Sequence, residues 1–184
     1  MSGSFRFLIR DGLESDISAC LDLDSSYETD YVWQMHIQRD PSQSNVVFKT
    51  ERLPRVMEVT YEVSRQRLRL ALPKEQCFVV AVGRDEPETL GYLVMSYNAM
   101  TQSAWVYDLV VSRLFRRRRI GTRLLNIARQ WASEHDAWQL TVETQTKNYP
   151  AIQFCQSSGL AFCGFSEQYF LNQDIAVFFG QTLR

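Results

Sequence analysis

The segment Asp108 to Leu125, DLVVSRLFRRRRIGTRLL, is the most informative stretch of this chain. It starts with apolar residues typical of a buried strand, passes through the basic run Arg116 to Arg119, and enters an amphipathic helix near Ile120. Amides at such a junction lack partners within the helix, and the helix dipole adds positive potential there. The segment therefore predicts a site for a phosphate or diphosphate group.

Two neighbouring residues strengthen this interpretation. Gly121 lets the backbone approach a ligand closely, and the Thr122 hydroxyl can donate a hydrogen bond. Two plainer interpretations also fit the arginines: a solvated charge run that opens a helix, or a nucleic-acid patch. The second is the weaker, because no aromatic residues interleave with the arginines and 21 acidic residues offset 20 basic ones. We expect no nucleic-acid partner.

The pattern on both sides of this segment predicts an α/β (α+β) fold. β-rich runs separated by turn residues precede it as an antiparallel meander, and strand and helix alternate after it. Two of the strands form a hairpin with a longish loop at Asp40 to Ser44, and Pro54 ends the second of them. The expected strands are 5–10, 31–38, 46–51, 76–82, 90–98, 104–111, 140–144, 162–165 and 175–182, and the expected helices are 11–23, 61–72, 120–131 and 150–157.

Bulk composition bounds the class of protein. A chain of 184 residues with 45% hydrophobic content can build one domain with a sizeable core. Its four cysteines show no metal-ligand spacing, so we expect free thiols and no metal. No stretch approaches the roughly 20 apolar residues of a membrane span, and no signal-peptide run opens the chain. We expect a cytoplasmic protein without a membrane partner.

The basic loop carries a resemblance to a known family. The run Arg116 to Gly121 resembles the Q/R-x-x-G-x-G/A diphosphate loop of the GNAT acetyltransferases and follows a matching strand, Leu109 to Val111. Later family motifs recur in order and spacing, and three elements in the correct order are far more specific than one loop. These later matches are Glu143, Asn148, Ala151 and Gly159.

The resemblance implies the GNAT fold: a mixed central sheet of about six to eight strands flanked by helices, with splayed strands forming an acetyl-CoA cleft. It implies a single domain, 1–184, with an acceptor-side part (1–75), an acetyl-CoA-binding core (76–165) and closing strands (166–184). It also implies an N-acetyltransferase that passes acetyl from acetyl-CoA to a primary amine by direct attack in a ternary complex, without a metal.

Acetyl-CoA contacts follow from the same resemblance. Arg119 stands where the family has its first loop glycine, so an ordinary residue must make the close approach there, or its guanidinium contacts phosphate. Asn148 fits both a contact to the pantetheine arm and a plain helix N-cap. The implied cofactor-binding residues are Leu109, Val110, Val111, Arg116, Arg117, Arg118, Arg119, Ile120, Gly121, Thr122 and Asn148.

Three residues, Glu143, Cys155 and Tyr169, are the main candidates for catalysis, and Tyr107 is a further one. An alkylammonium has a pKa of about 10.4, so its proton must be removed before it can attack a thioester. Glu143 matches the position of the family's base, although a surface or cation-orienting glutamate also fits. Cys155 stands where the family often has a tyrosine acid, and it equally fits an inert buried cysteine. Tyr169 and Tyr107 are alternative proton donors.

The N-terminal third sets acceptor choice in this family. Carboxylates and aromatic faces suit a cation, and a solvated loop before a strand fits the same residues. Leu23 to Trp33, LDSSYETDYVW, and VYDLVV at Val106 resemble streptothricin acetyltransferases, which implies a cationic small molecule. Polyamine or protein acetylation and a non-catalytic acyl-CoA sensor remain alternatives, and a homodimer stays open. The expected substrate-binding residues are Tyr27, Glu28, Asp30, Tyr31, Trp33 and Asp108.

Overall fold

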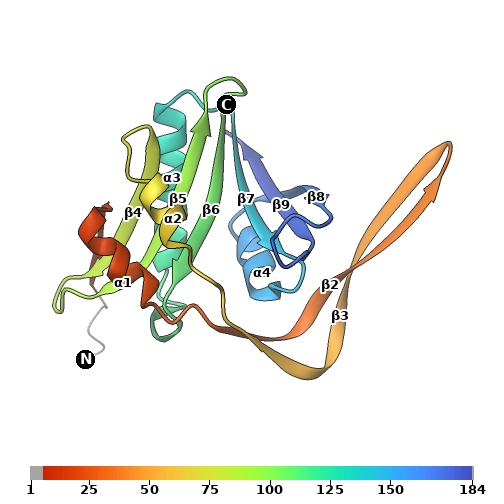
Figure 1. Ribbon diagram of the computed structural model, residues 1–184, viewed down its shortest axis with the longest axis horizontal. Coiled ribbons are helices and arrows are strands. Elements are labelled where there is room, and N and C mark those ends of the chain that lie inside the picture. The colour runs from red at the N-terminus through yellow and green to blue at the C-terminus, as the bar shows by residue number, and fades with distance from the viewer. Residues whose placement is uncertain (1–5, 184) are drawn as a thin grey trace. The chain divides into compact units, whose positions relative to one another are not determined.

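The computed structural model describes residues 6–183 (Figure 1). It confirms the expected order of elements with shifted bounds, and Phe5 of the first expected strand lies outside the described residues. In chain order the elements are β1 (Phe7–Asp11), η1 (Glu14–Asp16), α1 (Ile17–Leu21), β2 (Tyr27–Asp40), β3 (Gln43–Val59), α2 (Arg65–Leu70), β4 (Gln76–Gly83), β5 (Thr89–Asn98), β6 (Ser103–Val111), η2 (Arg113–Phe115), α3 (Ile120–Glu134), β7 (Gln139–Gln145), α4 (Tyr149–Ser157), β8 (Ala161–Ser166) and β9 (Ala176–Thr182).

Seven strands form one sheet in the order β1-β4-β5-β6-β7-β9-β8, and β2 and β3 form a second, two-stranded sheet. The pairs β1–β4, β4–β5 and β5–β6 are antiparallel, whereas β6 and β7 are parallel. The expected mixed sheet and the meander from β4 to β6 are therefore confirmed.

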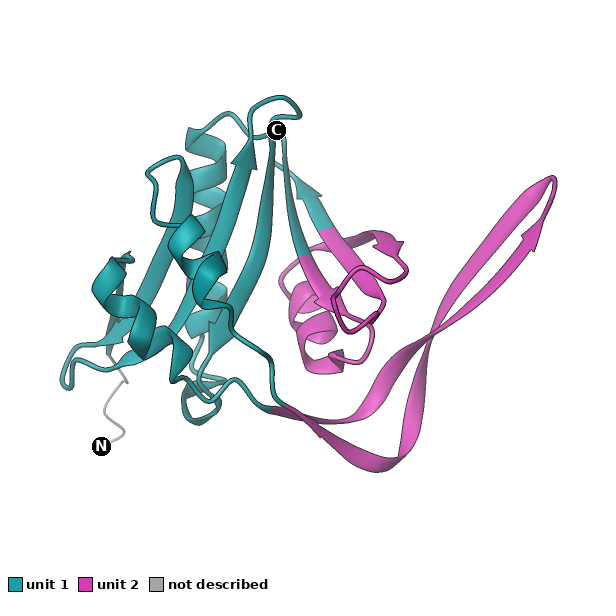
Figure 2. Cartoon of the chain, viewed as in Figure 1, with its two compact units in different colours: residues 1–26, 60–142, 180–184 teal, residues 27–59, 143–179 magenta. Residues whose placement is uncertain are grey.

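The described chain divides into two compact units (Figure 2). The first contains residues 6–26, 60–142 and 180–183, and the second contains residues 27–59 and 143–179. Strands β7 and β9 each pass from one unit into the other. The boundaries expected for acceptor-side and cofactor-side parts remain predictions.

Helices cover both faces of the sheet in the first unit (Figure 1). On one face, α3 buries residues at helical spacing: Ile120, Leu124, Leu125, Ala128 and Ala132. On the other face, α1 and α2 pack on Phe78, Val80, Tyr92 and Val94 with Leu68 in the centre. The strands β4 and β5 are apolar on both faces because both faces are covered.

The hairpin of β2 and β3 is longer than expected, and its turn is tighter. Asp40 pairs with Gln43, so the connection has two residues instead of a longish loop. The prediction that Pro54 ends the second strand is wrong, because β3 continues to Val59. Tyr31 pairs with Arg52 and Thr29 with Met57, so Pro54 lies in a bulge where no ladder hydrogen bond needs its missing N–H.

The helix expected over 61–72 is also shorter than predicted, since α2 covers only Arg65–Leu70. Its start is fixed by a cap: the Ser64 hydroxyl accepts a hydrogen bond from the Arg67 amide at 3.3 Å. Tyr61 therefore precedes the helix, and its side chain serves another purpose, described below.

An aromatic cluster forms the packing centre of the second unit. Trp33 of β2 lies 5.7 Å from Phe48 and 5.6 Å from Phe179, measured between ring centroids. Phe162 of β8 contacts Trp33 and Phe48 edge-on at 5.7 and 5.3 Å. These tilted and edge-on geometries are the favourable ones for aromatic pairs, so the cluster joins β2, β3, β8 and β9.

A buried carboxylate closes the turn between β1 and α1. Both oxygens of Asp16 accept from Arg10, at 2.6 and 2.8 Å, and the Leu13 amide donates to Asp16 Oδ2 at 2.8 Å. The Arg10 hydrogen bonds, helped by the Leu13 amide and opposed by burial, hold the pKa of Asp16 below its ordinary value of 3.8. A depressed pKa in the folded state means that this contribution to stability is lost as the pH falls through it.

We expect Asp16→Asn to lower the free energy of unfolding by about 1–3 kcal/mol at neutral pH, because charged hydrogen bonds are replaced by weaker ones. Urea denaturation at neutral pH and again at a pH below the depressed pKa of folded Asp16, well under 3.8, measures the effect. The difference between the two proteins should shrink at the lower pH, where the carboxylate is protonated in both the folded and the unfolded parent. Glu14→Gln, at an exposed position in the same turn, is the control. A difference that persists in acid would contradict this account.

Candidate active site

The basic loop before α3 has an unusual backbone. Arg117 and Arg119 have φ angles of 63° and 64°, in the left-handed region, on either side of Arg118. A positive φ is uncommon for residues that carry a side chain, so the chain turns sharply at both positions. Arg119 is the N-cap of α3, and its side chain makes no capping hydrogen bond. The N-cap side chain therefore does not occupy the first amides of the helix. Its role as a diphosphate site remains a prediction for the loop.

Arg116 differs from the three arginines that follow it. Its Nε donates to the Val111 carbonyl at 3.0 Å, and its side chain is half-buried. Burial lowers its pKa, and neighbouring Asp24 acts in the opposite direction. Arg116 thus fastens the loop to the end of β6, whereas Arg117, Arg118 and Arg119 are exposed.

Strand β6 is bonded unevenly to its two neighbours. It pairs with β5 as far as Val111, but its ladder with β7 covers only Ser103–Val106 opposite Gln139–Val142. A register shift against β5 places an extra residue, Tyr107, next to the last paired residue. Because a bulge bends a strand, the ladder ends where β6 bends. Leu109, Val110 and Val111 therefore lie on a stretch whose described ladder partners are in β5 alone.

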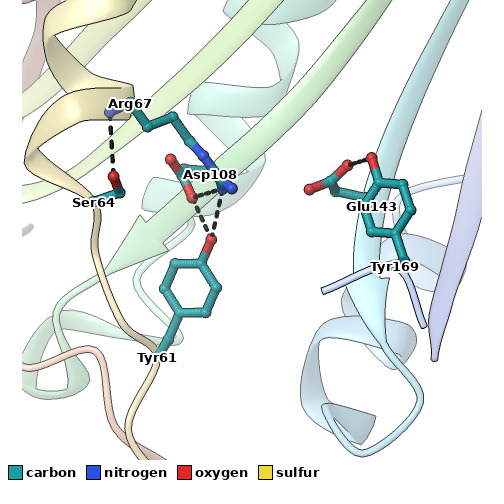
Figure 3. A network of polar contacts seen from close by, with 6 residues as sticks. All are labelled: Tyr61, Ser64, Arg67, Asp108, Glu143 and Tyr169. Carbon is teal, nitrogen blue, oxygen red and sulfur yellow. Dashed lines mark hydrogen bonds and ion pairs between the residues drawn. The ribbon is translucent and has the colours of Figure 1, made fainter. Parts of the chain in front are cut away.

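A polar network lies on the same strand (Figure 3). Asp108 is 2% exposed, and its Oδ1 accepts from the Tyr61 hydroxyl and from Arg67 Nη1, the latter at 3.0 Å. Burial raises the pKa of Asp108 against the opposing effects of Arg67 and Tyr61. Its second oxygen, Oδ2, is buried and has no hydrogen-bond partner among the described residues.

Glu143 and Tyr169 are in contact within the second unit (Figure 3). The Tyr169 hydroxyl donates to Glu143 Oε2 at 2.7 Å. Glu143 is 9% exposed at the C-terminal half of β7, and Tyr169 is 41% exposed, with its ring against Phe170 and Phe178. Two of the three residues predicted for catalysis are thus brought together across 26 positions of sequence.

The third predicted catalytic residue, Cys155, is in the interior. It is 1% exposed on α4, and burial raises the pKa of its thiol to about 12. Asn148 is the N-cap of α4, where its Oδ1 accepts from the Ala151 amide at 3.2 Å. The N-cap interpretation of Asn148 is confirmed, and a contact from its amide nitrogen to a ligand remains a prediction.

The expected acceptor residues of β2 have varied surroundings. The Tyr27 ring is buried, its hydroxyl has no hydrogen-bond partner among the described residues, and burial raises its pKa to about 12. Asp30 forms a 3.7 Å ion pair with Arg52. Tyr31 contacts the Tyr149 ring at 5.6 Å between centroids, Trp33 belongs to the aromatic cluster, and Glu28 is exposed.

Sequence reasoning missed Tyr61 and Arg67. They precede Asp108 by 47 and 41 positions. The segment that carries them reads only as an amphipathic helix, and no spacing rule connects it to β6.

Within residues 6–183, no group of three or more His, Cys, Asp or Glu side chains is arranged to hold a metal ion. The four cysteines are free, as predicted. Within the same residues, no helix combines the length and apolarity needed to cross a membrane.

Comparison with known proteins agrees with this geometry. Residues 29–160 match the acetyltransferase (GNAT) family. A streptothricin acetyltransferase of Streptomyces lavendulae is 36% identical over 85 residues, which is 46% of this chain and 44% of that protein. The match thus spans less than half the length of this curated relative.

Solved structures share the fold over nearly the whole chain. A nourseothricin acetyltransferase has a TM-score of 0.81 at 21% identity, over 97% of this chain and 99% of that one. A candidate streptothricin acetyltransferase from Bacillus anthracis, solved with acetyl coenzyme A, has a TM-score of 0.77 at 21% identity, over 96% of this chain and 99% of that one. At this identity the likeness establishes the GNAT fold, and the family match covers more than half of the sequence. The chain belongs to the acetyltransferase (GNAT) family.

Proposed function

We propose that this protein transfers the acetyl group of acetyl-CoA to a primary amine by direct attack within a ternary complex. The observation that carries the proposal is the hydrogen bond from Tyr169 to Glu143 at 2.7 Å. It pairs a carboxylate suited to accept a proton with a hydroxyl suited to donate one. Family membership supports acetyl-CoA as the donor.

The loop at the start of α3 fits the diphosphate of acetyl-CoA. The left-handed residues Arg117 and Arg119 turn backbone amides toward an anion, and the exposed guanidiniums add positive charge. Arg116 holds the loop against β6 through Val111, so it positions the amides rather than binding phosphate itself. The side-chain oxygen of Asn148 caps α4, so its amide nitrogen can donate a hydrogen bond to the pantetheine arm of acetyl-CoA.

Glu143 and Tyr169 together account for the protons of the reaction. Glu143 takes a proton from the ammonium, directly or through a water, and the neutral nitrogen forms the new C–N bond. As the C–S bond breaks, Tyr169 gives its proton to the leaving thiolate and regains one from Glu143 across their hydrogen bond. The second nitrogen proton leaves to solvent, which balances the step. Cys155 is then a packing residue, because its buried thiol holds its proton too tightly to serve here.

The developing oxyanion needs a donor. The ladder of β6 with β7 ends at Val106, so the stretch Leu109 to Val111 presents peptide N–H groups at an edge that β7 does not pair. We assign one of them to the acetyl oxygen, in the manner of an oxyanion hole. Because the donor belongs to the backbone, side-chain substitutions there do not remove it.

A cationic small molecule is the acceptor that we favour, with streptothricin-type antibiotics first. Glu28 and Asp30 of β2 are carboxylates that a cation can reach, and the neighbouring aromatic residues of β2 suit the same charge. The sequence match to the Streptomyces lavendulae enzyme supports the same class of acceptor.

Release of free coenzyme A thiol from acetyl-CoA tests the function. We expect turnover with streptothricin that exceeds turnover with spermidine, an aminoglycoside or a lysine peptide. Initial rates at varied concentrations of both substrates should give intersecting double-reciprocal lines, as a ternary complex requires. No turnover on any amine, with acetyl-CoA shown to be bound, would contradict the proposal and favour an acyl-CoA sensor.

We expect substitutions of Glu143 and Tyr169 to have non-additive effects on kcat. We expect Glu143→Gln to lower kcat by about 10²–10³-fold and Tyr169→Phe by about tenfold or more, because each removes one partner of a proton relay. The double variant should be no slower than Glu143→Gln within a few-fold. Acetyl-CoA affinity, measured by calorimetry, should stay unchanged. Fully additive losses in kcat would show that the two residues act independently. An unchanged kcat in Glu143→Gln would show that Glu143 is not the base.

Two substitutions at Arg119 separate backbone strain from charge. Arg119→Gly and Arg119→Ala both remove the guanidinium, but only glycine adopts the left-handed conformation without strain. We expect the glycine variant to exceed the alanine variant by about 1 kcal/mol in free energy of unfolding, measured with urea.

Calorimetry on the same pair tests the loop amides. Both variants should bind acetyl-CoA within about tenfold of the parent at low salt, because amides do most of the binding and one charged contact is lost. Equal stability of the two variants would contradict the strained loop. A complete loss of binding in both would show that the guanidinium, rather than the amides, holds the cofactor.

A further inference from the structure

A cavity of about 710 Å³ lies in the first unit, and the proposed mechanism does not use it. No lining residue is charged, and amide, hydroxyl and aromatic side chains predominate. The residues that line it are Gln76, Ser96, Tyr97, Asn98, Ala99, Thr101, Ser103, Trp105, Tyr107, Trp138 and Gln139.

Sheet register places most of these residues on one face. Gln76 pairs with Ser96, and Ser96 pairs with Trp105, so these three form a row across β4, β5 and β6. Asn98, Ser103 and Gln139 form a second row across β5, β6 and β7. Directly paired residues lie on the same face of a sheet, so the two rows form one polar floor with Trp105 in it.

The opposite face at this position is closed. Ala104, Val106 and Leu140 alternate with the floor residues and are buried. Tyr97, paired with Ala104, contacts His135 at the end of α3 with 6.3 Å between ring centroids. The floor therefore lies on the other face from α3, the face that α1 and α2 cover farther along the strands.

Hydrogen bonds fix the turn at the edge of the cavity. Asn98 Oδ1 accepts from the amides of Met100 and Thr101, and the hydroxyls of Thr101 and Ser103 are 2.7 Å apart. Trp138 Nε1 donates to the Thr101 carbonyl at 2.9 Å. These bonds hold the cavity wall in place, which lowers the entropy cost of binding a ligand.

The polar floor continues toward Asp108. Val94 is paired with Asp108 and precedes Ser96 by two residues, which is a separation of about 7 Å along β5. Tyr107 lines the cavity and lies under the Arg67 guanidinium, 5.8 Å from ring centroid to Cζ. The buried carboxylate and the neutral cavity thus adjoin on one face of the sheet.

We propose that this cavity binds a neutral, polyhydroxylated ring that the amine acceptor carries, a sugar or sugar-like group. Side-chain amides and hydroxyls both donate and accept, as hydroxyl groups do, and the Trp105 ring offers a flat surface to the C–H face of a pyranose. The absence of charge in the lining argues against an anionic or a second cationic group. This inference rests on the proposed amine acceptor and specifies its chemistry.

Ligand-observed NMR titrations test the proposal with three amines that each carry one positive charge. Ethylamine supplies the ammonium alone, glucosamine adds a hydroxylated ring, and cyclohexylamine adds an apolar ring. We expect glucosamine to bind most tightly to the intact protein. Trp105→Ala should weaken glucosamine about tenfold and leave ethylamine unchanged. Trp105→Phe should restore much of the loss.

Two further variants sharpen the test. Gln76→Leu should weaken glucosamine but not cyclohexylamine, because it removes only hydrogen bonds. Trp131→Ala is the control, since Trp131 stacks on His135 outside the cavity. Tighter binding of cyclohexylamine than of glucosamine, or a glucosamine preference that survives Trp105→Ala, would overturn the proposal.

Binding is measured without turnover, so failure of this inference and failure of the proposed function are distinguishable. Glucosamine that binds at the cavity but is never acetylated, together with ethylamine that is never acetylated, would reject the function and keep the subsite. Acetylation of both amines at rates that Trp105→Ala does not change would reject the subsite and keep the function.

Discussion

The partial pairing of β6 is the constraint on which the rest of the site depends. This strand keeps its ladder with β5 to Val111 but leaves β7 after Val106. The extra residue Tyr107 lies at that point, and such a bulge changes the direction in which the following side chains point. As a result Asp108 points into the core beneath α2, where Tyr61 and Arg67 meet it, and Trp105 remains on the polar floor. One bulge therefore supplies an unpaired backbone edge, a buried carboxylate and the boundary of a cavity.

The loop after β6 shows how a departure from a family pattern is absorbed. Glycine is the usual residue where the backbone must be left-handed, because an L side chain there costs about 1–2 kcal/mol. Arg119 adopts that conformation with φ of 64°, and Arg117 does the same two residues earlier. The surroundings hold the loop in place, since Arg116 is bonded to the Val111 carbonyl and α3 buries Ile120 at once. The loop keeps its shape at a cost in stability and gains cationic side chains beside its amides.

Sequence predicted the parts of this site that depend on local pattern. The loop between β6 and α3, the helix start at Ile120 and the position of Glu143 on β7 follow from local motifs, whereas the hydrogen bond from Tyr169 to Glu143 does not. Long-range side-chain contacts were not predictable in this way. Trp33 packs against Phe48 and Phe179, which its sequence does not indicate, and its contact with an acceptor remains a prediction. Pro54 reads as a strand end but lies in a bulge, so there strand pairing overrides the local signal.

Asp108 is held through only one of its two oxygens. Buried polar atoms without a partner are rare, because each one loses its hydration without compensation. Tyr61 and Arg67 both donate to Oδ1, so they share one acceptor and leave Oδ2 aside. A purely structural ion pair would gain by using both oxygens of the carboxylate, as Arg10 does with Asp16. The one-sided arrangement therefore leaves a buried acceptor, Oδ2, without a partner among the described residues, and it holds Asp108 in place through Oδ1 alone.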